Sequence, residues 1–124
     1  MKNIKILIWC HKQSMVPDSK IMLPIEVGAD LRKKHIEEIL QDNQGENISS
    51  KNKMYCELTA QYWAWKNLPA DVIGLVHYRR YMGKKNGIVG LIQRYRNPLG
   101  SILDGKDIEK LMKKSDIILP KRRK

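Results

Sequence analysis

The sequence predicts an α/β fold in which helices flank a mainly parallel sheet. Short apolar runs alternate with segments of helical composition along the 124 residues. Two of the runs, residues 4–10 and 72–76, are apolar on both faces. Such runs are typical of parallel strands that helices cover from both sides. The alternation favours right-handed crossovers within one domain that spans residues 1–124.

The elements of the first half follow from local composition. Residues 4–10 are expected to form a strand, and residues 21–27 a shorter one that Pro24 places at an edge or in an irregular segment. Residues 30–40 have helical composition, and residues 42–53 are rich in Asn, Gly and Ser, which indicates a loop. A helix is expected over residues 54–67, with Asn52 as its cap. Its apolar residues recur at helical spacing and predict one buried face: Met54, Leu58, Tyr62 and Trp65.

The second half continues the alternation. Residues 72–76 form the next strand, residues 83–100 show no clear period, and residues 101–114 form a helix that Ser101 or Asp104 caps. A last strand is expected over residues 116–119, closed by Pro120. Because a parallel strand usually leads on to a covering element, we expect the fold to be incomplete at the C-terminus.

Composition narrows the classes of protein and partner. The net charge of +11 favours anionic partners, but the basic residues are dispersed and no nucleic-acid-binding motif is recognised, so specific nucleic-acid binding is not expected. No apolar run reaches the ~20 residues that span a bilayer, and no signal peptide is recognised. With two cysteines, we expect a cytoplasmic protein with reduced thiols. A basic surface also suits peripheral association with the inner face of the membrane.

Cationic side chains follow the apolar run of residues 72–76. His77, Tyr78, Arg79 and Arg80 stand directly after residues 72–76. In open α/β sheets, ligands bind beyond the carboxyl ends of the strands, and guanidinium groups match phosphate oxygens. The residues therefore indicate a bound anion, most simply a phosphate. The alternative, that both arginines are solvated residues that end a strand, stays open.

Three blocks of sequence, residues 42–52, 55–67 and 73–81, carry a resemblance to a known family. The chain resembles bacterial glycosyltransferases of capsular and exopolysaccharide biosynthesis, long catalogued as a domain of unknown function. Residues 24–29 and 116–120 match the same pattern. The resemblance implies a GT-A-like fold, a nucleotide-sugar donor and a saccharide or lipid-linked saccharide acceptor, with this chain as the donor half. A truncated non-catalytic remnant or binding module is the alternative, and a basic nucleic-acid-binding domain is a third hypothesis.

The resemblance also implies which residues bind the donor. In GT-A folds the loop after the first strand meets the nucleotide, and amide and carboxylate side chains can recognise sugar hydroxyls. Glu57 either stabilises a helix start or reaches a sugar or a cation. The candidate donor-binding residues are His11, Asp42, Asn43, Asn47, Glu57, His77, Arg79 and Arg80.

We expect no cofactor. Many GT-A enzymes bind a divalent metal through an Asp-x-Asp motif, which this sequence lacks. The cationic side chains at His77–Arg80 would neutralise the negative charge of a diphosphate, as a bound metal does in those enzymes. Binding of a divalent metal stays an open alternative. His77 has the alternative role of a satisfied buried histidine. The catalytic base stays unknown, since Asp42, Glu46 and Glu57 qualify by residue type alone.

Overall fold

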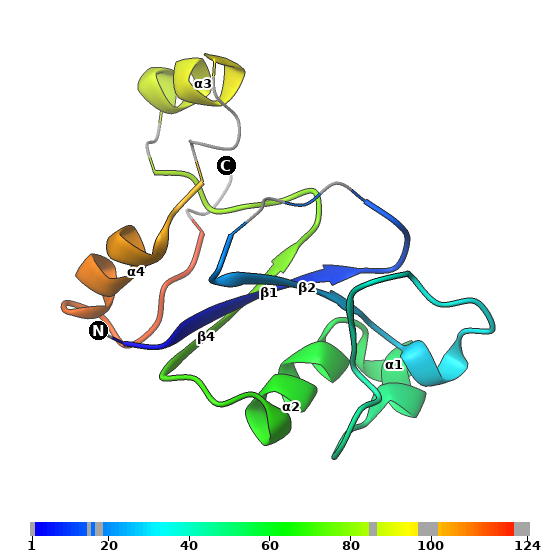
Figure 1. Ribbon diagram of the computed structural model, residues 1–124. Coiled ribbons are helices and arrows are strands. Elements are labelled where there is room, and N and C mark those ends of the chain that lie inside the picture. The colour runs from blue at the N-terminus through cyan, green and yellow to red at the C-terminus, as the bar shows by residue number, and fades with distance from the viewer. Residues whose placement is uncertain (1, 15, 17–18, 85–86, 97–101, 121–124) are drawn as a thin grey trace. The chain divides into compact units, whose positions relative to one another are not determined.

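The structure, a computed structural model, describes residues 2–14, 16, 19–84, 87–96 and 102–120 (Figure 1). The chain divides into two compact units, Met1–Arg80 and Tyr81–Lys124. The first unit contains the sheet and every candidate site residue.

A four-stranded parallel sheet forms the centre of the first unit. Its strands are β1 (Ile4–Cys10), β2 (Met22–Glu26), β3 (Leu40–Gln41) and β4 (Val72–His77), in the order β3-β2-β1-β4. β1 pairs with β2 from Ile6–Met22 onward and with β4 from Ile4–Val72 onward. The predicted α/β class with a parallel sheet is therefore confirmed.

The helix α2 (Leu58–Asn67) covers one face of this sheet (Figure 1). Alternate residues of a strand point to opposite faces, so Leu7 and Ile25 project toward α2 while their neighbours project away. The side chains of α2 that pack against them are small, apart from the indole of Trp63. Because most of them are small, the helix lies close to the strands. The buried cluster comprises Leu7, Ile25, Val27, Ala60, Trp63 and Ala64.

Pro24 lies inside β2, which is flanked on both sides. β3 pairs only with Ile25 and Glu26, so Pro24 has no strand on its outer side. The missing N–H of proline therefore breaks no ladder hydrogen bond toward β3. The expectation of an edge position is correct locally, although β2 as a whole lies between two strands.

The helix expected over residues 30–40 is not formed. A short 3-10 turn, η1 (Ala29–Leu31), is followed by turns and β3. The carboxylate of Glu26 accepts a hydrogen bond from the backbone N–H of Ile36 at 2.6 Å, and Glu38 has a φ of 60°. A captured N–H and a left-handed residue are both incompatible with a continuous α-helix. A long-range contact overrides the local propensity here.

The helix expected over residues 54–67 is broken in two. α1 (Asn52–Tyr55) ends at Cys56, whose φ is 50°, and α2 begins at Leu58. Of the two tryptophans in α2, Trp63 is buried, whereas Trp65 is 67% exposed. The apolar stripe predicted to be buried is therefore largely exposed, because Ala60, Trp63 and Ala64 supply the face that packs on the sheet.

The second unit contains α3 (Gly87–Arg96) and α4 (Gly105–Met112). Of the two expected caps, Asp104 caps α4 in a capping box with Asp107, and Ser101 lies outside the described residues. α3 falls in the segment without clear period, where two glycines reduce helix propensity.

The strand expected over residues 116–119 is not formed. Ile117 and Leu119 are exposed, and the segment pairs with no described strand. An extended segment gains ladder hydrogen bonds only beside a partner, so the apolar composition is insufficient by itself.

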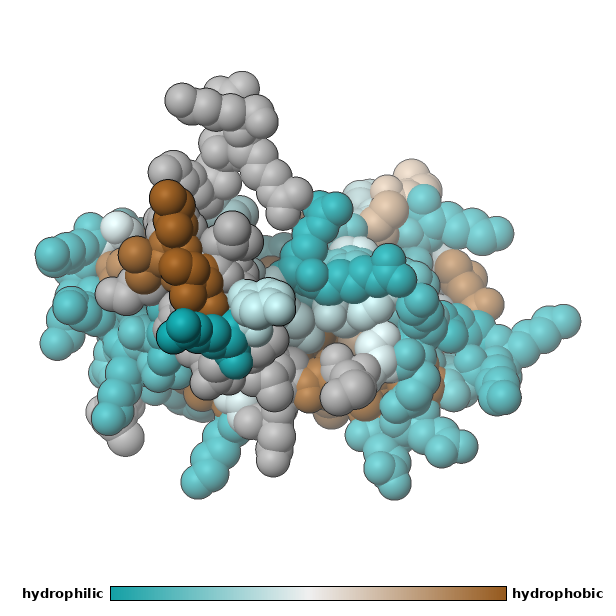
Figure 2. Space-filling model, turned by 90° about the horizontal axis from the view of Figure 1, so that it is seen from above, coloured by the Kyte–Doolittle hydropathy of each residue, from teal (hydrophilic) through white to brown (hydrophobic). Residues whose placement is uncertain are grey.

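Hydrophilic side chains cover most of the face shown in Figure 2, in keeping with 24 Lys and Arg residues in the sequence. Within the described residues, no helix has the length and apolar character needed to cross a bilayer.

Candidate functional site

The candidate site lies at the carboxyl ends of β1 and β4. The chain leaves β1 for β2 on one side, and later returns to pair β4 with the other side of β1. The two strand ends therefore flank the point where the strand order reverses, which is where open α/β sheets bind ligands. The last register pair between these strands joins Trp9 to His77.

Aromatic rings from both strand ends pack against one another. The indole of Trp9 contacts the ring of His77 edge-on, with centroids 4.4 Å apart. His77 stacks on Tyr78 at 4.3 Å, and the ring of His11 meets Tyr78 edge-on at 5.3 Å. Tyr78 is buried, which makes it the rigid base of the group. These four residues together with Arg79 and Arg80 are called the strand-end cluster below.

The cluster presents its cations to solvent. Arg79 and Arg80 are exposed, and the guanidinium carbon of Arg79 lies 5.5 Å from the centroid of Tyr78. Lys12 adds an ammonium 6.0 Å from the same ring. Among the described residues, no carboxylate lies within ion-pair distance of Arg79 or Arg80. The cluster is therefore suited to bind an anion.

A tight turn fixes the orientation of His77. The backbone N–H of Arg80 donates to the carbonyl of His77 at 2.9 Å, and the N–H of Arg79 donates to Nδ1 of His77 at 3.0 Å. Since Nδ1 accepts, the proton of the neutral ring resides on Nε2. The Nε2–H is left as a donor for a ligand.

The pKa of His77 is lowered from its usual 6.5, first by burial and then by His11, Arg80 and Arg79. Glu57 acts in the opposite sense, so its carboxylate lies within electrostatic reach of the cluster. The imidazole is therefore neutral at pH 7, and the arginines supply the positive charge. Four predicted residues, His11, His77, Arg79 and Arg80, thus lie in one cluster, and Glu57 lies within electrostatic reach of it.

The polar loop forms a second group around Asp42. This residue is fully buried, and its carboxylate accepts from the N–H groups of Gly28 at 2.8 Å and Ala29 at 3.0 Å. The hydroxyls of Ser49 and Thr59 donate to it at 2.6 and 2.5 Å. The carboxylate joins the turn after β2 to the loop and to α2. A direct contact between Asp42 and a donor stays a prediction.

Asn43 and Asn47 brace the same loop. The Asn47 amide donates to the carbonyls of Asn43 at 3.1 Å and Gly45 at 2.7 Å, and its oxygen accepts from the N–H of Ser49 at 3.1 Å. The Asn43 amide donates to Asp30 at 3.1 Å. No hydrogen bond, ring contact or ion pair between described residues joins Asn43 or Asn47 to the strand-end cluster. Their contact with a donor also stays a prediction.

Sequence reasoning missed two features of the site. Trp9 forms a wall of the cluster, and the available signal was an aromatic residue near the end of the first strand. Gly28 is the second feature, because its φ of 65° turns the chain after β2 and its N–H bonds to Asp42. A Cβ there would lie 2.7 Å from Cγ of Asn52, so both the backbone angle and the space favour glycine.

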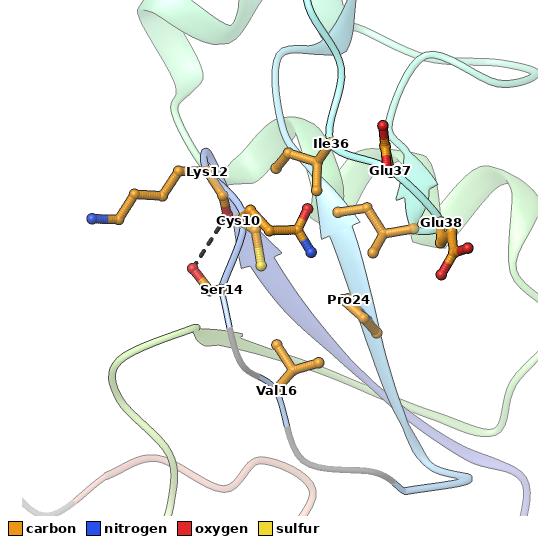
Figure 3. Close-up of a pocket in the computed structure, with 10 residues that line it drawn as sticks. Cys10, Lys12, Ser14, Val16, Pro24, Ile36, Glu37 and Glu38 are labelled. Atoms are coloured by element: carbon orange, nitrogen blue, oxygen red, sulfur yellow. Dashed lines mark hydrogen bonds between the residues drawn. The ribbon is translucent and has the colours of Figure 1, made fainter.

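A pocket of about 210 Å³ is lined in part by Lys12, whose ammonium lies 6.0 Å from the centroid of Tyr78 in the strand-end cluster. Figure 3 shows Cys10 and Pro24 from adjacent strands beside it, with Ile36 and Glu38 from the segment before β3. Burial raises the pKa of the Cys10 thiol, so this thiol is neutral at pH 7. Within the part of the chain that the structure describes, no group of three or more His, Cys, Asp or Glu residues is arranged to hold a metal ion.

Comparison with known proteins places the chain in a family. Residues 5–124 match a family described as a domain of unknown function, DUF4422. No curated protein matches the chain. A solved structure, the apo form of the WbbM bifunctional glycosyltransferase, is 33% identical with a TM-score of 0.71. The match covers 90% of this chain and 21% of that chain, so this chain spans about a fifth of the solved one.

This similarity agrees with the GT-A-like architecture expected for the sheet and its flanking helices. The chain is related to a glycosyltransferase by both sequence and fold. Since the family match extends over nearly the whole sequence, the chain belongs to the DUF4422 family.

Proposed function

We propose that this chain binds the nucleotide-activated sugar donor of a glycosyltransferase, with the diphosphate held by the strand-end cluster. The observation that carries the proposal is the pair of exposed arginines, which no described carboxylate neutralises, on a rigid aromatic base at the switch point of the sheet. The related solved protein is a bifunctional glycosyltransferase, which supports the same class of donor.

The chemistry of transfer requires stabilisation of the leaving nucleoside diphosphate. Negative charge grows on the diphosphate as the bond to the sugar breaks, and preorganised cations stabilise that charge. Arg79 and Arg80 would supply positive charge, and the Nε2–H of His77 would donate a hydrogen bond to a phosphate oxygen. We propose that these groups act without a divalent metal, in place of an Asp-x-Asp motif.

The remaining predicted residues have distinct roles in this proposal. His11 lines the nucleotide side of the cluster, and Glu57 accepts hydrogen bonds from donor-sugar hydroxyls. Asp42, Asn43 and Asn47 hold the loop that faces the sugar. The acceptor is a saccharide or a lipid-linked saccharide of capsular or exopolysaccharide biosynthesis, used at the cytoplasmic face of the membrane.

The test is titration of uridine diphosphate into the protein by calorimetry, with and without EDTA. Arg79→Ala should weaken binding by about 1.5–3 kcal/mol, the scale of a hydrogen bond to a charged group. Lys20→Ala is the matched control, because exposed Lys20 precedes β2 at the opposite end of the sheet. This variant should bind as wild type does, and EDTA should have no effect.

Two results would overturn the proposal. One is the absence of any uridine diphosphate binding by the wild-type chain. The other is unchanged affinity in folded Arg79→Ala. Loss of binding in EDTA would remove the metal-independent part alone.

A donor-binding module without transfer activity is the second candidate. It draws on the extent of the match, which covers 21% of the solved glycosyltransferase chain. An assay with a radiolabelled nucleotide sugar separates the two candidates, because the module would bind uridine diphosphate and release no labelled product.

A further inference from the structure

We infer that Arg32 is a positioning residue that fixes the chain after β1, and that the buried carboxylate of Glu26 anchors it. The inference rests on the proposed function, because the chain after β1 carries His11 and Lys12 into the strand-end cluster. Among the interactions of the described residues, Arg32 itself contacts none of the four rings of the cluster.

Glu26 is a charged residue in a position where charge is costly. It ends β2 and is fully buried. Its carboxylate accepts from the N–H of Ile36 and lies within hydrogen-bond distance of Nδ1 of His35, both at 2.6 Å. Nε of Arg32 lies 3.5 Å from the same carboxylate, at ion-pair distance. These three neighbours compensate for the lost hydration and leave Glu26 with one orientation.

Arg32 joins Glu26, at the end of β2, to the segment that follows the neighbouring strand β1. Its Nη1 donates to the carbonyl oxygen of His11 at 2.5 Å. That carbonyl belongs to the first residue after β1, so the bond sets the plane of the peptide that leads to Lys12. The side chain of His11 leaves the same residue and meets Tyr78 at 5.3 Å.

The arrangement is better explained by positioning than by stability. Nε of Arg32 is buried and has no hydrogen-bond partner among the described residues, where the ion pair alone joins it to Glu26. The Arg32 side chain is 30% exposed, so solvent screens this ion pair and reduces its contribution to stability. The hydrogen bond that Arg32 donates goes to the carbonyl of His11. This bond therefore acts on the position of His11, which belongs to the strand-end cluster.

The first test measures the free protein by NMR. Arg32→Ala should lower the backbone order parameters of residues 11–14 from about 0.85 to below about 0.6 and shift the ring protons of His11. Arg32→Lys keeps the charge but lacks the planar fork, so it should restore only part of the order. Glu26→Gln should shift the same signals, because it removes the charge that anchors Arg32. Lys33→Ala is the matched control, since it removes one exposed positive charge next to Arg32.

The second test measures affinity for uridine diphosphate. Arg32→Ala should weaken binding about tenfold, as expected for loss of one charge-assisted hydrogen bond, whereas Lys33→Ala should leave it unchanged. If wild type does not bind uridine diphosphate, the proposed function fails and the order parameters alone decide the inference. The inference is overturned if folded Arg32→Ala and Arg32→Lys give the order parameters and His11 ring shifts of the Lys33→Ala control.

Discussion

Asp42→Asn tests whether the buried carboxylate organises the polar loop. Each carboxylate oxygen accepts one backbone N–H and one hydroxyl: Oδ2 takes Gly28 and Thr59, and Oδ1 takes Ala29 and Ser49. In the asparagine side chain, only one of these two oxygens remains, because an NH2 group replaces the other. Whichever oxygen the NH2 group replaces, one backbone N–H loses its acceptor and faces another donor.

The expected magnitude follows from this count. The hydroxyls of Ser49 and Thr59 can rotate and accept from the new NH2 group, so their cost is small. A buried N–H without an acceptor costs about 1–3 kcal/mol, and the other bonds weaken because the acceptor is no longer charged. The free energy of unfolding should therefore fall by about 2–4 kcal/mol. A domain with a typical free energy of unfolding of about 5–15 kcal/mol can lose that amount and stay folded.

Urea denaturation followed by circular dichroism measures this change. The midpoint should fall while the slope m stays constant, since the surface exposed on unfolding is the same. Asp30→Asn is the matched control, because Asp30 is exposed and, within the described part of the chain, its side chain accepts a hydrogen bond from Asn43 alone. The control should stay within about 0.5 kcal/mol of wild type. A similarly small change in Asp42→Asn would refute the reasoning.

Two further predictions concern His77 and Gly28. The pKa of the His77 ring should lie below 6.5 in the free protein, because burial and neighbouring cations disfavour the imidazolium. Its contribution to stability is then present above pH 6.5 and lost as the pH falls through the folded pKa. Bound uridine diphosphate should raise this pKa, which NMR titration of the ring would show. Gly28→Ala should destabilise the fold by about 1–3 kcal/mol in urea denaturation, because the φ of 65° and the 2.7 Å approach to Asn52 exclude a Cβ.

Each of these predictions has a decisive outcome. A His77 pKa at or above 6.5 in the free protein would show that the imidazolium is not disfavoured. Gly105→Ala is the control for Gly28→Ala, because Gly105 begins α4 and alanine favours a helix there. Equal stability of the two variants would contradict the steric argument.

The central strand β1 and its partner β4 could be predicted because their signal is local. Residues 4–10 are apolar except for Lys5 and residues 72–76 are all apolar, and parallel pairing brings the carboxyl ends of β1 and β4 to one edge of the sheet. The proximity of His11 and His77 follows from that geometry alone. Asp104 was one of two candidate caps in the sequence, because capping depends on the residues that immediately precede a helix.

The features that sequence reasoning missed depend on distant contacts. The segment 30–40 has helical composition, yet the Glu26 carboxylate captures the N–H of Ile36 and prevents a continuous helix. Asp42 resembles any polar loop residue in sequence, and its four donors come from three separate segments. Side chains that bind distant backbone leave no periodic pattern in a sequence.

The position of β1 has a consequence for how the chain acquires its structure. β1 is made first but becomes an inner strand, and its start is joined to Asp71, 68 positions later, by a 2.7 Å hydrogen bond from the Asn3 N–H. During synthesis, one edge of β1 therefore stays open until residue 77 has left the ribosome. Pairings of such long sequence separation form slowly, since the chain loses loop entropy before it gains contacts. Nascent chains arrested before residue 72 should thus be protease-sensitive, and protection should begin only once β4 has emerged.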